Sequence, residues 1–153
     1  MSLGGGGGGG AMQQIQEQMQ ALEQEKQAIR AEIQRIQTEQ REIDEAIDAI
    51  ETLDTGSTVQ VPVGGDAYVR AAIADIEEIV VTLGGGYAAE RDSDGAIDSL
   101  EDKKDALDDR IAELESEIET VESETENLEA KAQQAQQQQM QQLQQQMQQQ
   151  DDE

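Results

Sequence analysis

Apolar residues alternate at three- and four-residue spacing in two stretches of this chain, and this pattern limits the fold more than any other feature of the sequence. The stretches run from Met12 to Ile50 and from Ile97 to Ala135. A heptad pattern of this length favours a coiled coil over a single amphipathic helix. At a rise of 1.5 Å per residue, each stretch would form a helix of about 58 Å. We therefore expect two equal arms in an antiparallel coiled-coil hairpin.

The two apolar seams contain a few polar residues. The first seam is Met12, Ile15, Met19, Leu22, Lys26, Ile29, Ile33, Ile36, Gln40, Ile43, Ile47 and Ile50. The second is Ile97, Leu100, Lys104, Leu107, Ile111, Leu114, Ile118, Val121, Thr125, Leu128, Ala132 and Ala135. Ser93 or Asp94 can cap the second helix, since Ser and Asp side chains accept hydrogen bonds from the first turn.

Between the arms the periodicity changes to that of β-strands. Val59–Val63 alternates apolar and polar residues, Gly64–Asp66 can turn, and Tyr68–Ile73 reads as a second strand. Ile79–Leu83 forms a third strand, and Gly84–Gly86 permits the next reversal because glycine accepts positive φ. The segment therefore predicts two β-hairpins.

Two short hairpins cannot bury a core by themselves, and their strands would leave unpaired edges in water. Pro62 indicates that the first strand lies at a sheet edge or contains a bulge, because proline cannot donate a hydrogen bond to a neighbouring strand. We therefore expect this segment to join subunits. The residues expected at the subunit contact are Val59, Val61, Val63, Val69, Ile73, Ile79, Val81 and Leu83.

Composition excludes several classes of protein. The chain has no Phe, Trp, Cys or His, so it lacks the usual core aromatics, the thiol nucleophile, the usual general base and most transition-metal ligands. Its net charge of −25 opposes nucleic-acid and anionic-membrane partners. We therefore expect that the protein is not an enzyme and has no cofactor or metal site, and that it is cytoplasmic. We also expect adaptation to concentrated salt, where repulsion between its acidic side chains is screened. An ordinary acidic coiled coil stays open as an alternative.

Two weaker motifs have plain structural readings. Asp92–Gly95 resembles the opening of a calcium loop but lacks its later ligands, which favours helix capping. Gly84–Tyr87 could approach a phosphate, but no basic residue follows it, so a hairpin turn is favoured.

The chain divides by composition into five segments. These are a flexible Gly-rich lead-in (1–11), an N-terminal coiled-coil helix (12–54), two β-hairpins (55–92), a C-terminal coiled-coil helix (93–135) and a Gln-rich tail that is a frayed helix or disordered (136–153). An antiparallel hairpin would bring apolar residues of both ends to one tip. These are Met12, Ile15, Met19, Met140, Leu143 and Met147, of which the last three are one residue out of phase with the seam. Methionine offers an adaptable apolar surface, so we expect this tip to bind other proteins; seam packing for the first set and disorder for the second remain open.

The middle of the chain resembles the alpha subunits of archaeal prefoldins. The resemblance rests on Val61–Gly65 (Val-Pro-Val-Gly-Gly), Tyr68–Ala71 (Tyr-Val-Arg-Ala), Leu83–Gly86 (Leu-Gly-Gly-Gly) and the pair Glu90–Arg91. It covers Met12 to about Leu128, and the two hairpins match the alpha class, whereas the beta class has one. The polyglycine start and the glutamine tail depart from the family pattern.

The resemblance implies a mostly helical α+β fold and a hexamer of two alpha and four beta subunits. In such an assembly the hairpins form an intersubunit β-barrel platform, and the coiled-coil tips hold unfolded proteins without ATP and pass them to a group II chaperonin. The alternative that the residues leave open is a structural coiled-coil spacer or adaptor without client binding.

Overall fold

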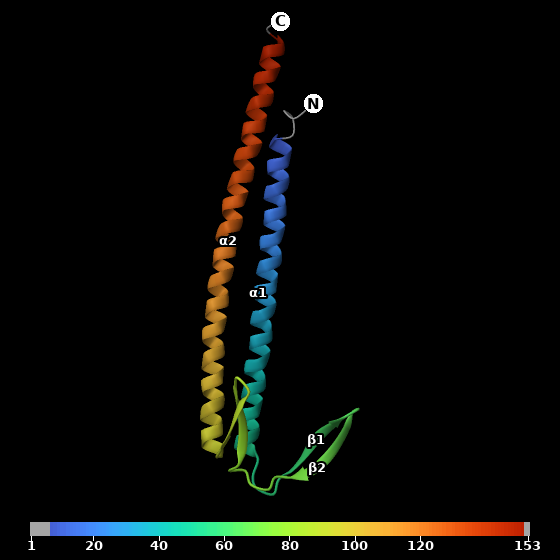
Figure 1. Cartoon of the computed structure of the whole chain (residues 1–153), viewed down its shortest axis with the longest axis vertical. Helices are drawn as coiled ribbons and strands as arrows, with labels where there is room; N and C mark the ends of the chain where they lie inside the picture. The colour runs from blue at the N-terminus through green and yellow to red at the C-terminus, as the bar shows by residue number, and fades with distance from the viewer. Residues whose placement is uncertain (1–6, 152–153) are drawn as a thin grey trace. The chain divides into compact units, whose positions relative to one another are not determined.

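The computed structural model describes residues 7–151, which form two long helices joined by two β-hairpins (Figure 1). The elements in chain order are helix α1 (Gly7–Thr52), strands β1 (Thr58–Gly64), β2 (Ala67–Ala72), β3 (Ile79–Gly84) and β4 (Tyr87–Arg91), and helix α2 (Ser93–Asp151). The expected mostly helical fold with two hairpins between the helices is confirmed. The described residues fall into a first unit, residues 7–33 with 113–151, and a second unit, residues 34–112.

In the first unit, α1 and α2 pack through their apolar seams. Ile29, Leu114 and Val121 are buried, which removes branched side chains from water where the two helices meet. The Lys26 ammonium lies 3.0 Å from a Glu122 carboxylate oxygen, so the start of α1 in this unit faces the later part of α2. The two helices of the first unit are antiparallel.

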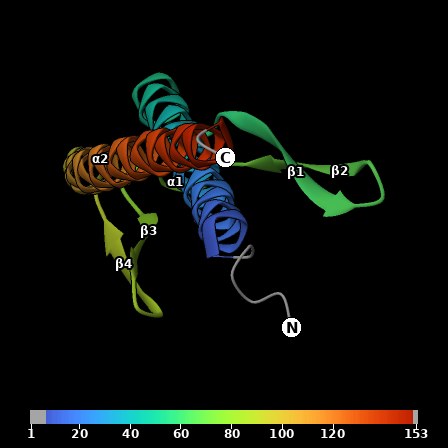
Figure 2. The same cartoon turned by 90° about the horizontal axis from the view of Figure 1, so that it is seen from above.

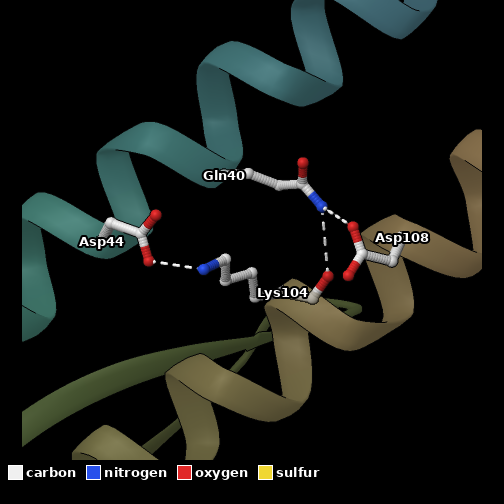
Figure 3. Close-up of polar contacts among 4 residues, drawn as sticks. All are labelled: Gln40, Asp44, Lys104 and Asp108. Atoms are coloured by element: carbon white, nitrogen blue, oxygen red, sulfur yellow. Dashed lines mark hydrogen bonds and ion pairs between the residues drawn. The ribbon is translucent and has the colours of Figure 1, made fainter.

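The second unit contains the other half of the helix pair and both hairpins. Ile36 and Ile43 are buried on α1. Beside them, the Gln40 amide donates to the Asp108 carboxylate at 2.6 Å and to the Lys104 carbonyl at 3.3 Å (Figure 3). The Lys104 ammonium in turn donates to Asp44 at 2.7 Å (Figure 3). These pairings run in opposite directions along the two helices, so the second unit is antiparallel as well.

Three of the polar seam residues share one geometry. Each reaches across to the acid that directly follows the opposite seam residue. Lys26 contacts Glu122, which follows Val121; Gln40 contacts Asp108, which follows Leu107; and Lys104 contacts Asp44, which follows Ile43. The long side chains thus keep their polar ends on a carboxylate at the flank while their methylenes remain beside the apolar seam. A polar residue in the seam is therefore tolerated without a buried unsatisfied group, and none occurs among the described side chains.

The Lys104 contact has a defined pH dependence. The hydrogen bond from Lys104 to Asp44 raises the pKa of the ammonium above its ordinary value of 10.5. A raised lysine pKa stabilises the folded state below the ordinary value, and this contribution is lost as the pH rises through the folded pKa. The lysine is therefore fully charged at neutral pH, and its contribution to the contact is lost in strongly alkaline solution.

The two hairpins have the same construction. In the first, Val61 pairs with Val69 and the turn residues Gly65 and Asp66 have φ of 57° and 59°. In the second, Val81 pairs with Ala89 and Gly85 and Gly86 take φ of 62° and 83°. Two consecutive residues of positive φ are what a two-residue type I′ hairpin turn requires. The register shifts just before each turn, between Pro62 and Gly64 and between Thr82 and Gly84.

Helix α2 begins with a cap that differs from the expected one. The Asp92 carboxylate accepts a hydrogen bond from the Gly95 N–H at 2.8 Å, and the Asp92 carbonyl accepts from the Ala96 N–H at 2.8 Å. Asp92 is therefore the N-cap, where the sequence predicts Ser93 or Asp94. Ser93 is engaged elsewhere, because its N–H and hydroxyl both donate to the Glu77 carboxylate, at 3.3 and 3.0 Å. Glu77 thereby ties the link between the hairpins to the first turn of α2.

Replacing Asp92 by Ala should lower the free energy of unfolding by about 1 kcal/mol, because the Gly95 N–H would lose its acceptor. Chemical unfolding followed by circular dichroism would measure the change. Asp94→Ala, which leaves the cap in place, is the matched control. Equal stability of the Asp92→Ala variant and the parent would contradict the assigned cap.

Both helices extend further than their seams predict. Helix α1 includes Gly7–Gly10, which fall in the expected flexible lead-in; residues 1–6 of that lead-in lie outside the described residues. Helix α2 continues through the Gln-rich tail to Asp151, while residues 152–153 also lie outside the description. Extending an existing helix adds one hydrogen bond per residue without a new nucleus, and glutamine has good helix propensity. Continuation of α2 through the glutamines is thus physically reasonable, whereas the glycines at the start of α1 have low helix propensity.

Candidate functional surfaces

The β1–β2 hairpin carries an apolar face without cover among the described residues. Cross-strand partners point to the same side, so Val61 and Val69 share this face and Val59 follows by alternation, while Val63 lies at the register shift before the turn. Val61 and Val69 are 43% and 51% exposed, and Val63 is exposed as well; Val59 is half-buried. We call Val59, Val61, Val63 and Val69 the valine face. All four are among the residues expected at a subunit contact.

The β3–β4 hairpin turns the equivalent face toward its own helices. Val81 is only 5% exposed, and Ile79 and Ala89 on the same face are half-buried. The hollow beside this face, about 410 Å³, is lined by Ala46, Ala49, Ile50, Ile79, Val80, Val81, Thr82, Leu100 and Lys103. Figures 1 and 2 show β3–β4 close to the helix ends, whereas β1–β2 points away from them. The structure thus places Val81 within the core of its own chain.

The outward side of the β3–β4 hairpin carries an apolar residue that the sequence analysis missed. Val80 is 68% exposed and pairs with Glu90, on the side opposite Val81. Leu83, near the turn, is also exposed. Alternation shows that Val80 and Val81 face opposite sides, but it does not say which side meets the helices. Because Ile79, Val80 and Val81 are all apolar, both sides of strand β3 carry an apolar residue, and the sequence alone does not show which side packs on the helices.

Ile73 lies at the base of the first hairpin, just beyond strand β2. Its N–H donates to the Ser57 carbonyl at 2.9 Å, and its carbonyl accepts from the Gly56 N–H at 2.7 Å. Ile73 is half-buried, so it closes the hairpin rather than standing on its exposed face. The next residues are held by the Thr55 hydroxyl, which accepts from the Ile76 N–H at 3.1 Å.

Both hairpins have free edges. The described strands form two separate two-stranded sheets, so each strand pairs on one side only. Unpaired strand edges beside exposed apolar side chains favour the addition of strands from another chain. The geometry therefore suits the hairpin segment for joining subunits.

The first set of tip residues lies in the helix pair. Met12, Ile15 and Met19 are each half-buried on α1. The antiparallel register places Ala135, Ala132 and Leu128 opposite them, and the two alanines are half-buried too. Met12 and Met19 therefore pack partly in the seam. Seam packing is the alternative to protein binding that the sequence leaves open for them.

The second set of tip residues lies on α2 beyond the start of α1. The same register places Gly7, the first described residue of α1, opposite Met140. Figure 1 shows α2 continuing past the start of α1. Met140, Leu143 and Met147 are 63%, 60% and 68% exposed. We call these three residues the terminal stripe. The structure does not merge the stripe with Met12, Ile15 and Met19, because α2 carries it past the described part of α1.

A groove in the first unit also exposes part of the seam. It measures about 430 Å³ and runs between the two helices beside Leu22 and Leu128. Its other lining residues are Gln18, Ala21, Glu25, Glu124, Asn127 and Lys131. An apolar floor between charged rims could accept a side chain from another protein.

The described residues offer little for chemistry. Within residues 7–151 no group of three or more His, Cys, Asp or Glu side chains is arranged to hold a metal ion. No helix in the same part of the chain is long and apolar enough to cross a membrane.

Comparison with known proteins agrees with this arrangement. Residues 22–152 match the family model described as prefoldin subunit. The chain is 67% identical over 94 residues to the prefoldin subunit alpha of Haloarcula marismortui, a match that covers 61% of each chain. It is 61% identical over 104 residues to that of Halobacterium salinarum, covering 68% of this chain and 67% of the relative.

Two solved structures have a similar fold. One is a cryo-EM structure of a filamentous prefoldin from Methanocaldococcus jannaschii, with a TM-score of 0.66 and 28% identity over 74% of this chain and 97% of the other. The second is the crystal structure of the prefoldin beta subunit from a Thermococcus strain, with a TM-score of 0.52, 22% identity and coverage of 81% and 90%. The latter likeness concerns the fold alone.

Proposed function

Because the chain belongs to the prefoldin family, in the class of the alpha subunits, we propose that it is a subunit of an ATP-independent chaperone. In this proposal it assembles with beta subunits, as two alpha and four beta, through a β-barrel platform built by the hairpins. The assembly binds unfolded proteins at the ends of its helix pairs and delivers them to a group II chaperonin in the cytoplasm. No catalytic step, cofactor or metal belongs to this function.

The uncovered valine face supports the assembly half of the proposal. Val61, Val63 and Val69 remain exposed in the single chain, while the equivalent face of β3–β4 is covered by the chain's own helices. Burial of one such side chain stabilises a contact by about 1.5–3 kcal/mol. A neighbouring subunit that covered this face and paired with the free strand edges would gain both apolar burial and hydrogen bonds.

The terminal stripe carries the client-binding half. Three large apolar side chains stand exposed on one side of the end of α2, from the level of Gly7 onward. An unfolded protein exposes apolar segments without a fixed shape, and flexible methionine side chains adapt to such segments. Each buried methylene contributes about 0.8 kcal/mol, so a few contacts hold a client weakly and reversibly. Several subunits would add avidity.

The decisive observation is therefore the exposure of the terminal stripe, and its removal is the test. Changing Met140, Leu143 and Met147 to Ser should reduce suppression of aggregation of a chemically unfolded protein at least about threefold, because the loss of several buried methylenes weakens each contact. The assay uses the full chain assembled with a prefoldin beta subunit, in molar salt and without nucleotide.

The matched control changes Gln141, Gln144 and Gln148 to Ser, which keeps the number and spacing of substitutions while leaving the apolar stripe intact. The control should protect as well as the parent. If the stripe variant also protects fully, the terminal stripe is not the client site. If the parent assembles but never suppresses aggregation, a structural spacer or adaptor becomes the better assignment.

A further inference from the structure

The sulfur chemistry of this chain is restricted to methionine. The sequence has five methionines, no cysteine and no tryptophan. A two-electron oxidant such as a hydroperoxide therefore meets thioether sulfur without competition from a thiol in the same chain. Four of the five methionines are described, and all four lie in the first unit, at Met12, Met19, Met140 and Met147.

These four thioethers differ in accessibility. Met140 and Met147 are mostly exposed; Met140 lies level with Gly7, the first described residue of α1, and Met147 lies beyond it. Met12 and Met19 are half-buried in the helix pair. Oxidation of methionine follows exposure, so the two pairs should react at different rates.

We propose that Met140 and Met147 form an oxidation site through which a hydroperoxide switches off the terminal stripe. The functional half of this proposal rests on the proposed role of the stripe in client binding. The site itself rests on the greater exposure of these two sulfurs and on the absence of cysteine from the sequence.

The reaction balances with the hydroperoxide as the only co-reactant. A sulfur lone pair attacks one peroxide oxygen, a sulfur–oxygen bond forms and the oxygen–oxygen bond breaks. The departing hydroxide of hydrogen peroxide, or alkoxide of an organic hydroperoxide, takes the proton of the transferred hydroxyl group and leaves as water or as an alcohol. Sulfur loses two electrons to the peroxide, and the product is methionine sulfoxide. A methionine sulfoxide reductase reverses the change with electrons from a dithiol.

The consequence follows from the position of the stripe. A sulfoxide oxygen is strongly polar, so oxidation of both methionines leaves Leu143 as the only apolar member of the terminal stripe. The helix pair itself should persist, because neither sulfur lies in the seam between α1 and α2. Oxidation would therefore remove the client surface and leave the fold and the assembly unchanged.

Mild hydrogen peroxide treatment of the full chain assembled with a beta subunit tests this proposal. Peptide mass spectrometry should show Met140 and Met147 gaining one oxygen at least about threefold faster than Met12 and Met19, in line with their greater exposure. After treatment the parent should lose at least about half of its aggregation suppression, with unchanged oligomer size. Reductase treatment should restore the suppression.

Two variants separate the causes. Met140→Leu with Met147→Leu removes both sulfurs from the stripe, and peroxide should leave the activity of this variant equal to its own untreated value. Met12→Leu with Met19→Leu should be inactivated like the parent. Equal oxidation rates at all four methionines, or equal loss of activity in the Met140→Leu/Met147→Leu variant, would overturn the proposal.

The peroxide experiment distinguishes failure of the oxidation switch from failure of the proposed chaperone function. If the untreated parent does not suppress aggregation, the chaperone assignment fails, and with it the functional half of the switch. The oxidation rates then still decide whether Met140 and Met147 are the preferred site. If the untreated parent is active and stays fully active with both methionines oxidised, only the switch is refuted.

Discussion

Changing Val61 and Val69 together to Asp should abolish assembly while leaving the helix pair folded. The two valines face each other across β1 and β2 and stand on the exposed valine face. In a subunit contact they would become two unpaired charges in an apolar surface, which costs several kcal/mol. Since each 1.4 kcal/mol is tenfold, assembly should weaken at least about 100-fold. Sedimentation velocity in molar salt, with and without a beta subunit, would measure it.

The hairpin offers a matched control for this change. Thr58 and Ala72 also face each other across β1 and β2, both are exposed, and both lie on the side opposite the valine face. Thr58→Asp with Ala72→Asp introduces the same two opposed charges without touching that face. The control should assemble nearly as the parent does. An unchanged particle size for the Val61→Asp/Val69→Asp variant would show that the valine face is not the contact.

Val81 does not serve this purpose, although the sequence predicts it at the subunit contact. A charge at Val81 would stand against the chain's own helices, beside Ala46, Ile50 and Leu100. Loss of assembly in such a variant would follow from a damaged subunit. Val80, on the outward side of the same strand and 68% exposed, is the better position on this hairpin for a test of partner contact.

Folding should depend strongly on salt. The chain carries 35 acidic against 10 basic residues, and most of the acids stand exposed on the helices. At about 0.1 M salt the Debye length is near 10 Å, so neighbouring carboxylates repel, whereas at about 1 M it falls to near 3 Å. We expect Tm to rise by at least about 10 °C between about 0.1 and 2 M KCl, as a relief of several kcal/mol of repulsion would give. Thermal unfolding followed by circular dichroism would measure it.

A charge variant distinguishes screening of repulsion from a general effect of salt. Changing Glu124, Glu126 and Glu129 to Gln removes three exposed acids from one stretch of α2. This variant should be more stable than the parent in dilute buffer and nearly equal to it in molar salt. Equal salt dependence in both proteins, or a fully folded parent in dilute buffer, would contradict the role of charge repulsion.

Much of the fold follows from spacing in the sequence. The three-four alternation from Met12 to Ile50 and from Ile97 to Ala135 gives both helices, and alternation with glycine turns gives both hairpins within a residue or two. These patterns act locally, since a heptad seam or a Gly-Gly turn suits few other conformations. The antiparallel register follows from equal seam lengths.

The features that sequence reasoning missed depend on contacts between distant residues. Asp92, Ser93 and Asp94 all have side chains that suit a helix N-cap. In the structure both donors of Ser93 bind Glu77, and the Asp92 carboxylate accepts from the first turn of α2. Val80 and Val81 are equally suited to face inward, and the helices decide between them. The seam also stops before the helices do, so it could not show that the terminal stripe lies beyond Gly7.

The repeated geometry of the polar seam contacts makes the length of the helix pair adjustable. Lys26 reaches Glu122 and Gln40 reaches Asp108 by the same step across the seam. Removing residues 29–35 from α1 together with 112–118 from α2 would delete one whole heptad from each helix, about 10 Å of rise, and bring matching seams together again. Both polar contacts, the hairpins and the terminal stripe would keep their neighbours. Insertions and deletions in heptad steps would therefore change the length of the helices while leaving the valine face and the terminal stripe unchanged.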